Sequence, residues 1–209
     1  MPLVRVTNFS VSLDGFAAGA PQSLESPFGH AGQRLHEWMF ATWADGAPTG
    51  VDAVFAARWD VGFGAEIMGA NKFGPPGWQD DPEWRGWWGE DPPFHTPTYV
   101  LTHRPREPLE MEGGTTFHFL STSPEQALAI AQEAAGDLDV RIGGGATTVR
   151  DFVAAGLVDH LHLVVVPIVL GHGTCLWDGL EGMEEGFHVE STSSPTGVVH
   201  LTFSRRPRA

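Results

Sequence analysis

The chain has 209 residues, of which 26 are acidic and 12 basic, giving a formal net charge of −14 at pH 7. A charge of this sign disfavours nucleic-acid binding through a broad basic surface, and no apolar run approaches the ~20 residues that a membrane-spanning helix needs. The single cysteine, Cys175, excludes an internal disulfide and a CxxC zinc site, and the first residues lack the pattern of a signal peptide, so we expect a cytoplasmic protein.

The first part of the chain predicts strands and helices in alternation. Residues 3–13 have the β-branched and aromatic bias of a strand, and an Asp-Gly pair ends it as a turn. Residues 31–44 and 51–59 have the apolar spacing of helices. A short strand is expected at residues 65–68.

Residues 74–97 have a different composition, with six prolines and four of the eight tryptophans. The prolines and glycines prevent a long regular element, whereas the aromatic content argues against disorder. We therefore predict an ordered insertion. It either packs over the sheet edge or a dimer partner, or forms a wall beside a flat aromatic ligand.

The second part of the chain continues the alternation. Ser123 is a typical helix cap, Pro124 suits the first helical turn and Gly136 ends the same helix. Further strands are expected at residues 98–102, 115–120, 139–142 and 159–166, with a helix at 147–155 and a hairpin at 187–206. This order predicts an α/β fold: a doubly wound, mostly parallel sheet with an antiparallel C-terminal edge hairpin, in one domain over residues 1–209.

Polar or glycine-rich segments follow several of the predicted strands. Because open α/β sheets bind ligands at the carboxyl ends of their strands, we expect these segments to share one rim. They are Asp14-Gly15, Gly69–Lys72, Thr102–Arg104 and Gly143–Thr148. Their cations, including the single lysine of the chain, are either phosphate ligands or solvated loop charges.

The segment DVRIGGGATTVRDF, residues 139–152, predicts a strand, a glycine turn and the start of a helix. Glycine lets a ligand approach the backbone closely, and the amides at a helix N-terminus favour negative charge. Gly143, Gly144 and Gly145 therefore indicate a phosphate cradle. The alternative is a tight strand-to-helix connection that binds nothing.

The chain resembles dihydrofolate-reductase-like proteins in segments that occur in the family's order: SLDGFAA (12–18), LHEWMF (35–40), IMGANKFG (67–74), YVLTHRP (99–105) and VRIGGGATTVRDFVAAGLVDHLHLVVVPIVLGHG (140–173). Its closer resemblance is to the reductase domain of the bifunctional riboflavin-biosynthesis deaminase-reductase, over nearly the whole chain except the tryptophan-rich insertion. The resemblance implies NADPH as cofactor, hydride transfer to a small nitrogen heterocycle, and a homodimer.

The resemblance also implies the residues that hold the cofactor. Those near its phosphates and ribose would be Gly69, Asn71 and Lys72; those near the 2′-phosphate and adenine, Thr102, His103 and Arg104; and those at the pyrophosphate, Gly143, Gly144, Gly145, Ala146, Thr147 and Thr148. The family usually has arginine directly after the Met-Gly pair, whereas Ala70 stands here, so phosphate recognition at this point is altered.

The reaction also needs a proton at the substrate, which a carboxyl group with a raised pKa can supply. Glu37, beside Trp38 and Met39, is the first candidate, and Asp14 at the end of the first strand is the second. The ordinary alternatives are an exposed helix carboxylate for Glu37 and a turn residue for Asp14.

The resemblance makes the ribosylaminopyrimidine of riboflavin biosynthesis the leading substrate. Dihydrofolate reduction, or a non-catalytic nucleotide-binding dimer with the same fold, are the alternatives. The sequence lacks the Pro-Cys-x-x-Cys motif of the deaminase half, so we expect only the reductase activity. His160 and His162 face one side of a strand, but without an evident third ligand we expect no metal site.

Overall fold

The computed structural model describes residues 2–44, 46 and 49–207. Its strands and helices in chain order are β1 (Val4–Ser12), β2 (Phe16–Ala18), α1 (Glu37–Phe40), α2 (Val51–Ala56), β3 (Phe63–Gly69), α3 (Ala70–Phe73), β4 (Pro97–Leu101), β5 (Leu109–Glu110), β6 (Thr116–Leu120), α4 (Pro124–Ala135), β7 (Asp139–Gly144), α5 (Ala146–Ala154), β8 (His160–Val166), β9 (Thr174–Cys175), β10 (Phe187–Ser193) and β11 (Val199–Arg205). No helix in this described part of the chain has the length and apolar character needed to cross a membrane.

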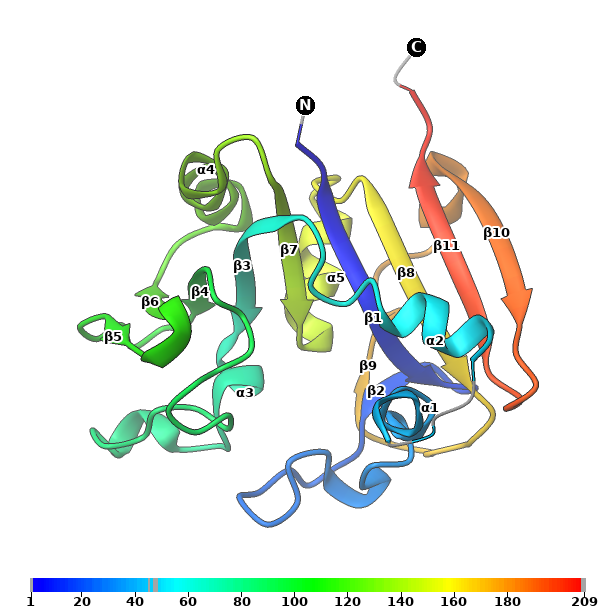
Figure 1. Cartoon of the computed structure of the whole chain (residues 1–209), viewed down its shortest axis with the longest axis horizontal. Helices are drawn as coiled ribbons and strands as arrows, with labels where there is room; N and C mark the ends of the chain where they lie inside the picture. The colour runs from blue at the N-terminus through cyan, green and yellow to red at the C-terminus, as the bar shows by residue number, and fades with distance from the viewer. Residues whose placement is uncertain (1, 45, 47–48, 208–209) are drawn as a thin grey trace.

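A nine-stranded sheet in the order β10-β11-β8-β1-β7-β3-β4-β6-β5 forms the centre of the molecule (Figure 1). The strands from β8 to β6 are parallel, and antiparallel pairs occur only toward the ends, at β5 and at the β10–β11 hairpin. A small second sheet pairs β2 with β9. The predicted α/β fold, with its mostly parallel sheet and antiparallel C-terminal hairpin, is confirmed.

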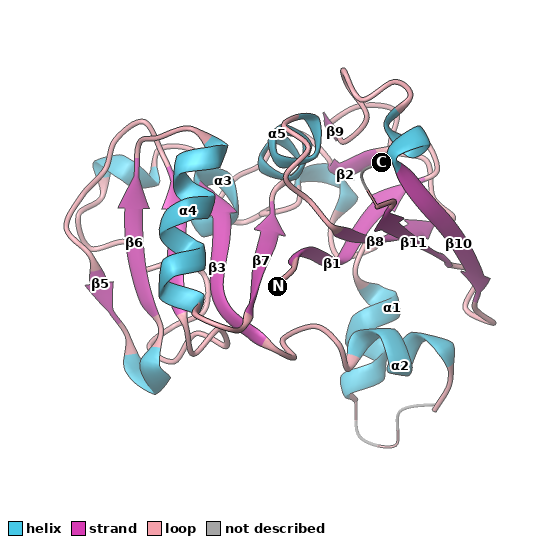
Figure 2. Ribbon diagram, turned by 90° about the horizontal axis from the view of Figure 1, so that it is seen from above, coloured by secondary structure: helices cyan, strands magenta, loops and turns pink. Residues whose placement is uncertain are grey.

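The two faces of the sheet are covered differently. On one face, α4 and α5 pack against the strands through side chains such as Leu128 and Phe152. On the other face, α1 and α2 cover β8 through Trp38 and Ala56, while the insertion covers β3, β4 and β6 separately. Figure 2 shows α5 and the α1–α2 pair on opposite sides of β1 and β8. On this second face, the α1–α2 pair and the insertion therefore cover different strands, and the centre of the sheet lies between them.

The predicted helix over residues 31–44 is wrong in extent. The structure has the one-turn helix α1, flanked by 3-10 turns at Gly29–Ala31 and Ala41–Trp43. Gly32 has a φ of 56°, a left-handed conformation that ends the first turn before α1 begins. The apolar spacing in this segment reflects burial against β8 and not a continuous helix.

The tryptophan-rich insertion is ordered, as predicted, and packs over the sheet edge. Trp78 and Phe94 are buried together with Phe117 and Phe119 of β6. Arg106 follows β4 and places its guanidinium 4.8 Å from the ring centroid of Phe119 and 5.2 Å from that of Trp78. Cation–π contacts and aromatic burial therefore hold the insertion against the sheet.

Candidate functional site

Strands β1 and β7 separate towards their carboxyl ends and open the sheet near its centre. Their ladder consists of the pairs Val4–Val140 and Arg5–Arg141, although β1 continues to Ser12. Beyond these pairs the two strands diverge, as Figure 1 shows. Since parallel α/β sheets bind ligands outside the carboxyl ends of their strands, this opening is the candidate site.

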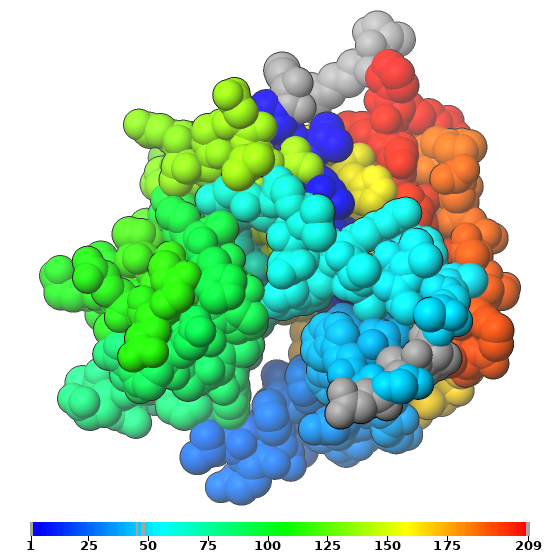
Figure 3. Space-filling model, viewed as in Figure 1, coloured from blue at the N-terminus to red at the C-terminus, as the bar shows by residue number. Residues whose placement is uncertain are grey.

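A narrow cleft lies at the same edge of the molecule. Gln22 and Ser23 line one wall, and Asn71, Pro75 and Trp87 line the other. Figure 3 shows the surface hollowed between these two segments. The insertion thus has a second role beside packing over the sheet edge, because it forms one side of the cleft.

The glycine turn joins β7 to α5 at the opening. Gly144 has a φ of 121°, which side chains rarely adopt, and a cis peptide bond links it to Gly145. Gly145 is the N-cap of α5, and no side chain of the described residues caps this helix start. The amide N–H groups of the first turn, from Ala146 to Thr148, can therefore donate hydrogen bonds to another partner.

Gly69 brings the end of β3 against the start of α5. A Cβ atom built on Gly69 would collide with the hydroxyl of Thr148, so only glycine fits at this position. Asn71 follows in α3, is exposed and lines the cleft. The structure thus brings Gly69 close to the glycine turn, while Asn71 faces the cleft two residues further on.

The segment Thr102–Arg104 lies one strand further along the rim. It follows Leu101, which is paired with Gly69 in the ladder between β4 and β3. Thr102 is buried and its hydroxyl accepts a hydrogen bond from the amide of Arg104 at 3.2 Å. His103 is exposed, and the Arg104 guanidinium lies 2.6 Å from the carboxylate of Asp80 in the insertion. This cation is therefore shared between the rim and the insertion.

Lys72 lies beside the glycine turn and takes part in an ion-pair cluster under it. Its Nζ donates to Oε1 of Glu66 at 2.7 Å, and Nη1 of Arg141 lies 3.3 Å from Oε2 of the same carboxylate. Glu66 on β3 stands opposite Arg141 on β7 in the ladder. Burial lowers the pKa of Lys72 to about 8; the charge of Glu66 opposes this shift and that of Arg141 adds to it.

The two carboxylates expected as proton donors lie in different surroundings. Asp14 accepts hydrogen bonds from the Ser12 hydroxyl at 2.6 Å and from the amides of Leu170 and Gly171 at 3.1 and 2.6 Å. These bonds, that of Ser12 foremost, lower the pKa of Asp14 to about 2, so it is ionised at neutral pH. Glu37 begins α1 and its side chain is exposed.

Sequence reasoning missed Glu66 and Arg141 as members of the site. Both stand inside apolar strands, and their side chains are only 3% and 5% exposed. A charged residue within a buried strand is itself a signal, because a buried charge needs a partner. Identifying that partner requires the register between β3 and β7, which the sequence does not contain.

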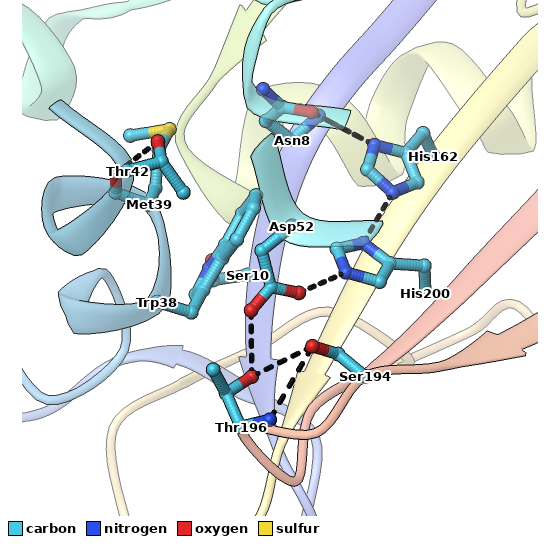
Figure 4. Close-up of polar contacts among 10 residues, drawn as sticks. All are labelled: Asn8, Ser10, Trp38, Met39, Thr42, Asp52, His162, Ser194, Thr196 and His200. Carbon is cyan, nitrogen blue, oxygen red and sulfur yellow. Dashed lines mark hydrogen bonds and ion pairs between the residues drawn. The ribbon is translucent and has the colours of Figure 1, made fainter. Parts of the chain in front are cut away.

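His162 belongs to a second polar cluster, under α1 and α2 (Figure 4). Its Nδ1 lies 2.9 Å from Oδ1 of Asn8, its Nε2 lies 3.1 Å from Nδ1 of His200, and Nε2 of His200 lies 2.8 Å from Oδ1 of Asp52. Phe55 stacks on both imidazoles, at centroid distances of 4.5 and 4.2 Å. Across the described residues, no three or more His, Cys, Asp or Glu side chains gather as a metal site would require.

The strand order, the central opening and the glycine turn define a dihydrofolate-reductase-like α/β protein. More narrowly, the chain belongs to the RibD C-terminal domain family, whose model matches residues 3–199. It is therefore a reductase-like domain of the kind found in riboflavin biosynthesis proteins. Among curated protein sequences, none matches this chain.

Solved structures share the fold at low sequence identity. A candidate riboflavin biosynthesis protein from Shewanella sp. PV-4 is 22% identical, with a TM-score of 0.62 over 99% of this chain and 100% of its own. A pyrimidine reductase-like protein from Corynebacterium diphtheriae is 15% identical, with a TM-score of 0.54 over 99% of this chain and 93% of its own. A diaminohydroxyphosphoribosylaminopyrimidine deaminase/5-amino-6-(5-phosphoribosylamino)uracil reductase from Thermotoga maritima is 14% identical, with a TM-score of 0.54 over 98% of this chain and 57% of its own.

Proposed function

We propose that this protein is an NADPH-dependent reductase that transfers a hydride to a small nitrogen heterocycle. The observation that carries the proposal is the helix start at Gly145, which lacks a side-chain cap and stands at the opening between β1 and β7. A protein of net charge −14 repels anions in general, so it needs such local donors to bind a diphosphate.

The proposed cofactor contacts follow the rim of the sheet. The diphosphate would bind the amides of residues 143–148, with Gly69 and Asn71 beside it, and the 2′-phosphate end would meet Thr102, His103 and Arg104. Adjacent strands lie ~4.8 Å apart, so β7 and β4 are separated by ~10 Å across β3. This distance suits one nucleotide with a diphosphate at one end and a 2′-phosphate at the other.

NADPH, when bound, supplies the hydride, while the protein positions the substrate and excludes water. The leading substrate is 5-amino-6-(5-phosphoribosylamino)uracil, which the name of the Thermotoga maritima relative contains. Trp87, in one wall of the cleft, would offer an aromatic face to a flat pyrimidine ring. Family membership is also the basis for proposing a homodimer and a cytoplasmic location.

Gly145 provides a sharp test of the cofactor site. It has a φ of −70°, and a Cβ atom built there meets open space, so side chains fit without strain. Gly145→Asp places a negative charge at the start of α5, whereas Gly145→Asn adds the same volume without the charge. We expect NADPH to bind the aspartate variant about tenfold or more weakly than the asparagine variant, a loss of about 1.4 kcal/mol.

Quenching of tryptophan fluorescence by NADPH and by NADH measures this binding. A wild-type protein that binds neither nucleotide would contradict the proposed function. Equal affinity of the two Gly145 variants would place the diphosphate elsewhere. Binding without turnover of any pyrimidine substrate would favour the non-catalytic nucleotide-binding dimer.

A further inference from the structure

A buried trio of charges lies directly beneath the glycine turn. The Glu66 carboxylate is only 3% exposed and divides its oxygens between two cations, Lys72 at Oε1 and Arg141 at Oε2. The Arg141 guanidinium also lies 4.3 Å from the ring centroid of Trp59, which covers it. One carboxylate therefore serves two cations, and the trio keeps a net positive charge.

Lys72 is the more exposed of the two cations in the trio. Its side chain is 21% exposed, against 5% for that of Arg141. A Cβ atom built on Gly143 would lie 2.5 Å from Nζ, and one on Gly144 would lie 3.6 Å from Cδ of Lys72 and 3.4 Å from the ring of Phe9. The ammonium group thus lies against the glycine turn and next to Glu66 of β3, and the Lys72 side chain lies beside Gly144, as does Phe9 of β1.

The surroundings of Lys72 favour the release of its proton. Burial removes water from the ammonium group, and the neighbouring Arg141 repels it, while Glu66 provides the one compensating negative charge. The ring centroid of Phe94 lies 5.4 Å from Nζ, a contact that favours the charged form but adds no negative charge. Its pKa of about 8 makes both protonation states accessible near neutral pH, as a general acid requires.

We propose that Lys72 is the general acid of the reduction assigned to the candidate site beside the glycine turn, which makes this inference dependent on the proposed function. Adding a hydride to the carbon of a C=N or C=O bond moves the π electron pair onto the nitrogen or oxygen. That atom takes a proton from Nζ of Lys72, which becomes a neutral amine and recovers a proton from water at its exposed side. The net change is one hydride and one proton added across the double bond.

Glu66 and Arg141 are positioning residues in this scheme. Glu66 holds Nζ in place through the 2.7 Å hydrogen bond, and Arg141 anchors Glu66 from the other side. The two competing roles for Lys72 are a contact to a cofactor phosphate and an ion pair that only stabilises the fold. The experiments below test the general-acid role against these two.

The first experiment uses the protein without any ligand. Lys72 is the only lysine in the chain, so protein labelled biosynthetically with carbon-13 lysine gives one lysine side-chain signal. We expect this signal to titrate with a pKa of about 8 in the full chain. A pKa at or above the ordinary lysine value of ~10.4 would overturn the proposal, because the group would then be a permanent cation.

The second experiment compares Lys72→Arg with Lys72→Met. Arginine keeps the charge and the pairing with Glu66 but does not release a proton in proteins. We expect Lys72→Arg to bind NADPH like the wild type. Its kcat for the reduction of 5-amino-6-(5-phosphoribosylamino)uracil should fall by about 100-fold or more. The pH dependence of kcat near pH 8 should disappear in both variants.

The kcat and NADPH-binding results of these variants test the general-acid role and the proposed function separately. Wild-type kcat in Lys72→Arg would overturn the general-acid role alone. Loss of NADPH affinity in Lys72→Met with kcat retained at saturation would identify Lys72 as a phosphate contact. A wild-type protein that binds neither NADPH nor NADH would overturn the proposed function and this inference together, whatever the lysine pKa.

Discussion

Asp14 is held as a charged acceptor by the Ser12 hydroxyl and by the amides of Leu170 and Gly171. These bonds connect the end of β1 to the segment after β8, beside the candidate site. They exist for the carboxylate and weaken when it takes a proton. A group that the fold keeps ionised in this way serves poorly as a proton donor at neutral pH, which leaves Lys72 better suited to that task.

The depressed pKa of Asp14 predicts a pH-dependent contribution to stability. The folded value is about 2 and the ordinary value is 3.8, so the unfolded state takes up the proton first as the pH falls. The stabilisation is therefore present above pH 3.8 and is lost towards pH 2. We expect Asp14→Asn to lower the urea midpoint at pH 7 and to match the wild type near pH 2. A difference of the same size at both pH values would contradict this role.

At the scale of elements, the glycine turn contains two positions with opposite requirements. A Cβ atom built on Gly143 would collide with Glu66 and Lys72, whereas one on Gly145 meets open space. We expect Gly143→Ala to lower the free energy of unfolding by about 1–3 kcal/mol, since the ion pair must move. Gly145→Ala, the matched control, should stay within about 0.5 kcal/mol of the wild type.

Urea unfolding of the two alanine variants measures the difference. The carbon-13 lysine signal reports independently whether Nζ has moved, because Lys72 is the only lysine. Equal stability of Gly143→Ala and Gly145→Ala would show that the turn tolerates a side chain beside the ion pair. Lys72 would then be less tightly held than the structure indicates.

Local signals predicted some elements well and one poorly. The helix α4 begins after Ser123, whose side chain accepts from the amide of Gln126, and ends at Gly136, as cap residues indicate. Those signals act within a few residues, so the sequence contains them in full. The segment 31–44 has the same apolar spacing as a helix, but its glycine conformation and packing against β8 depend on the rest of the fold.

At the scale of the whole molecule, the predicted rim depended on a rule about strand ends, and that rule held for the placement of the glycine turn beside Gly69. The orientation of Lys72 could not be predicted, because it depends on the buried Glu66 of β3, which is held in turn by Arg141 through the register between β3 and β7. Likewise, His160 and His162 were considered together from their spacing. The partner of His162 is instead His200, from the C-terminal hairpin.

The histidine cluster links β1, β8, β11 and α2, so its protonation affects the whole fold. Burial foremost, and then the charge of His200, lowers the pKa of His162 to about 3 from 6.5. The unfolded state therefore binds the proton first, and stability falls as the pH drops from 6.5 towards 3. We expect the free energy of unfolding to fall by at most about 1.4 kcal/mol per pH unit through this histidine.

Urea unfolding of the wild type and of His162→Gln between pH 7.5 and pH 5 checks this expectation. The variant should be less stable at pH 7.5 but should show a smaller loss below pH 6.5, because glutamine does not titrate. An identical slope in both proteins would assign the acid sensitivity to other groups. Burial also lowers the pKa of His160, so this histidine is the next candidate for the acid sensitivity.

The short ladder between β1 and β7 has a consequence for the protein's lifetime. Only two residue pairs join these central strands, so a ligand that binds between them adds contacts that hold the two strands together. A ligand present at a hundred times its Kd raises the free energy of unfolding by about 2.7 kcal/mol. For a reductase, turnover by proteases would then slow when its reductant is plentiful and quicken when it is scarce.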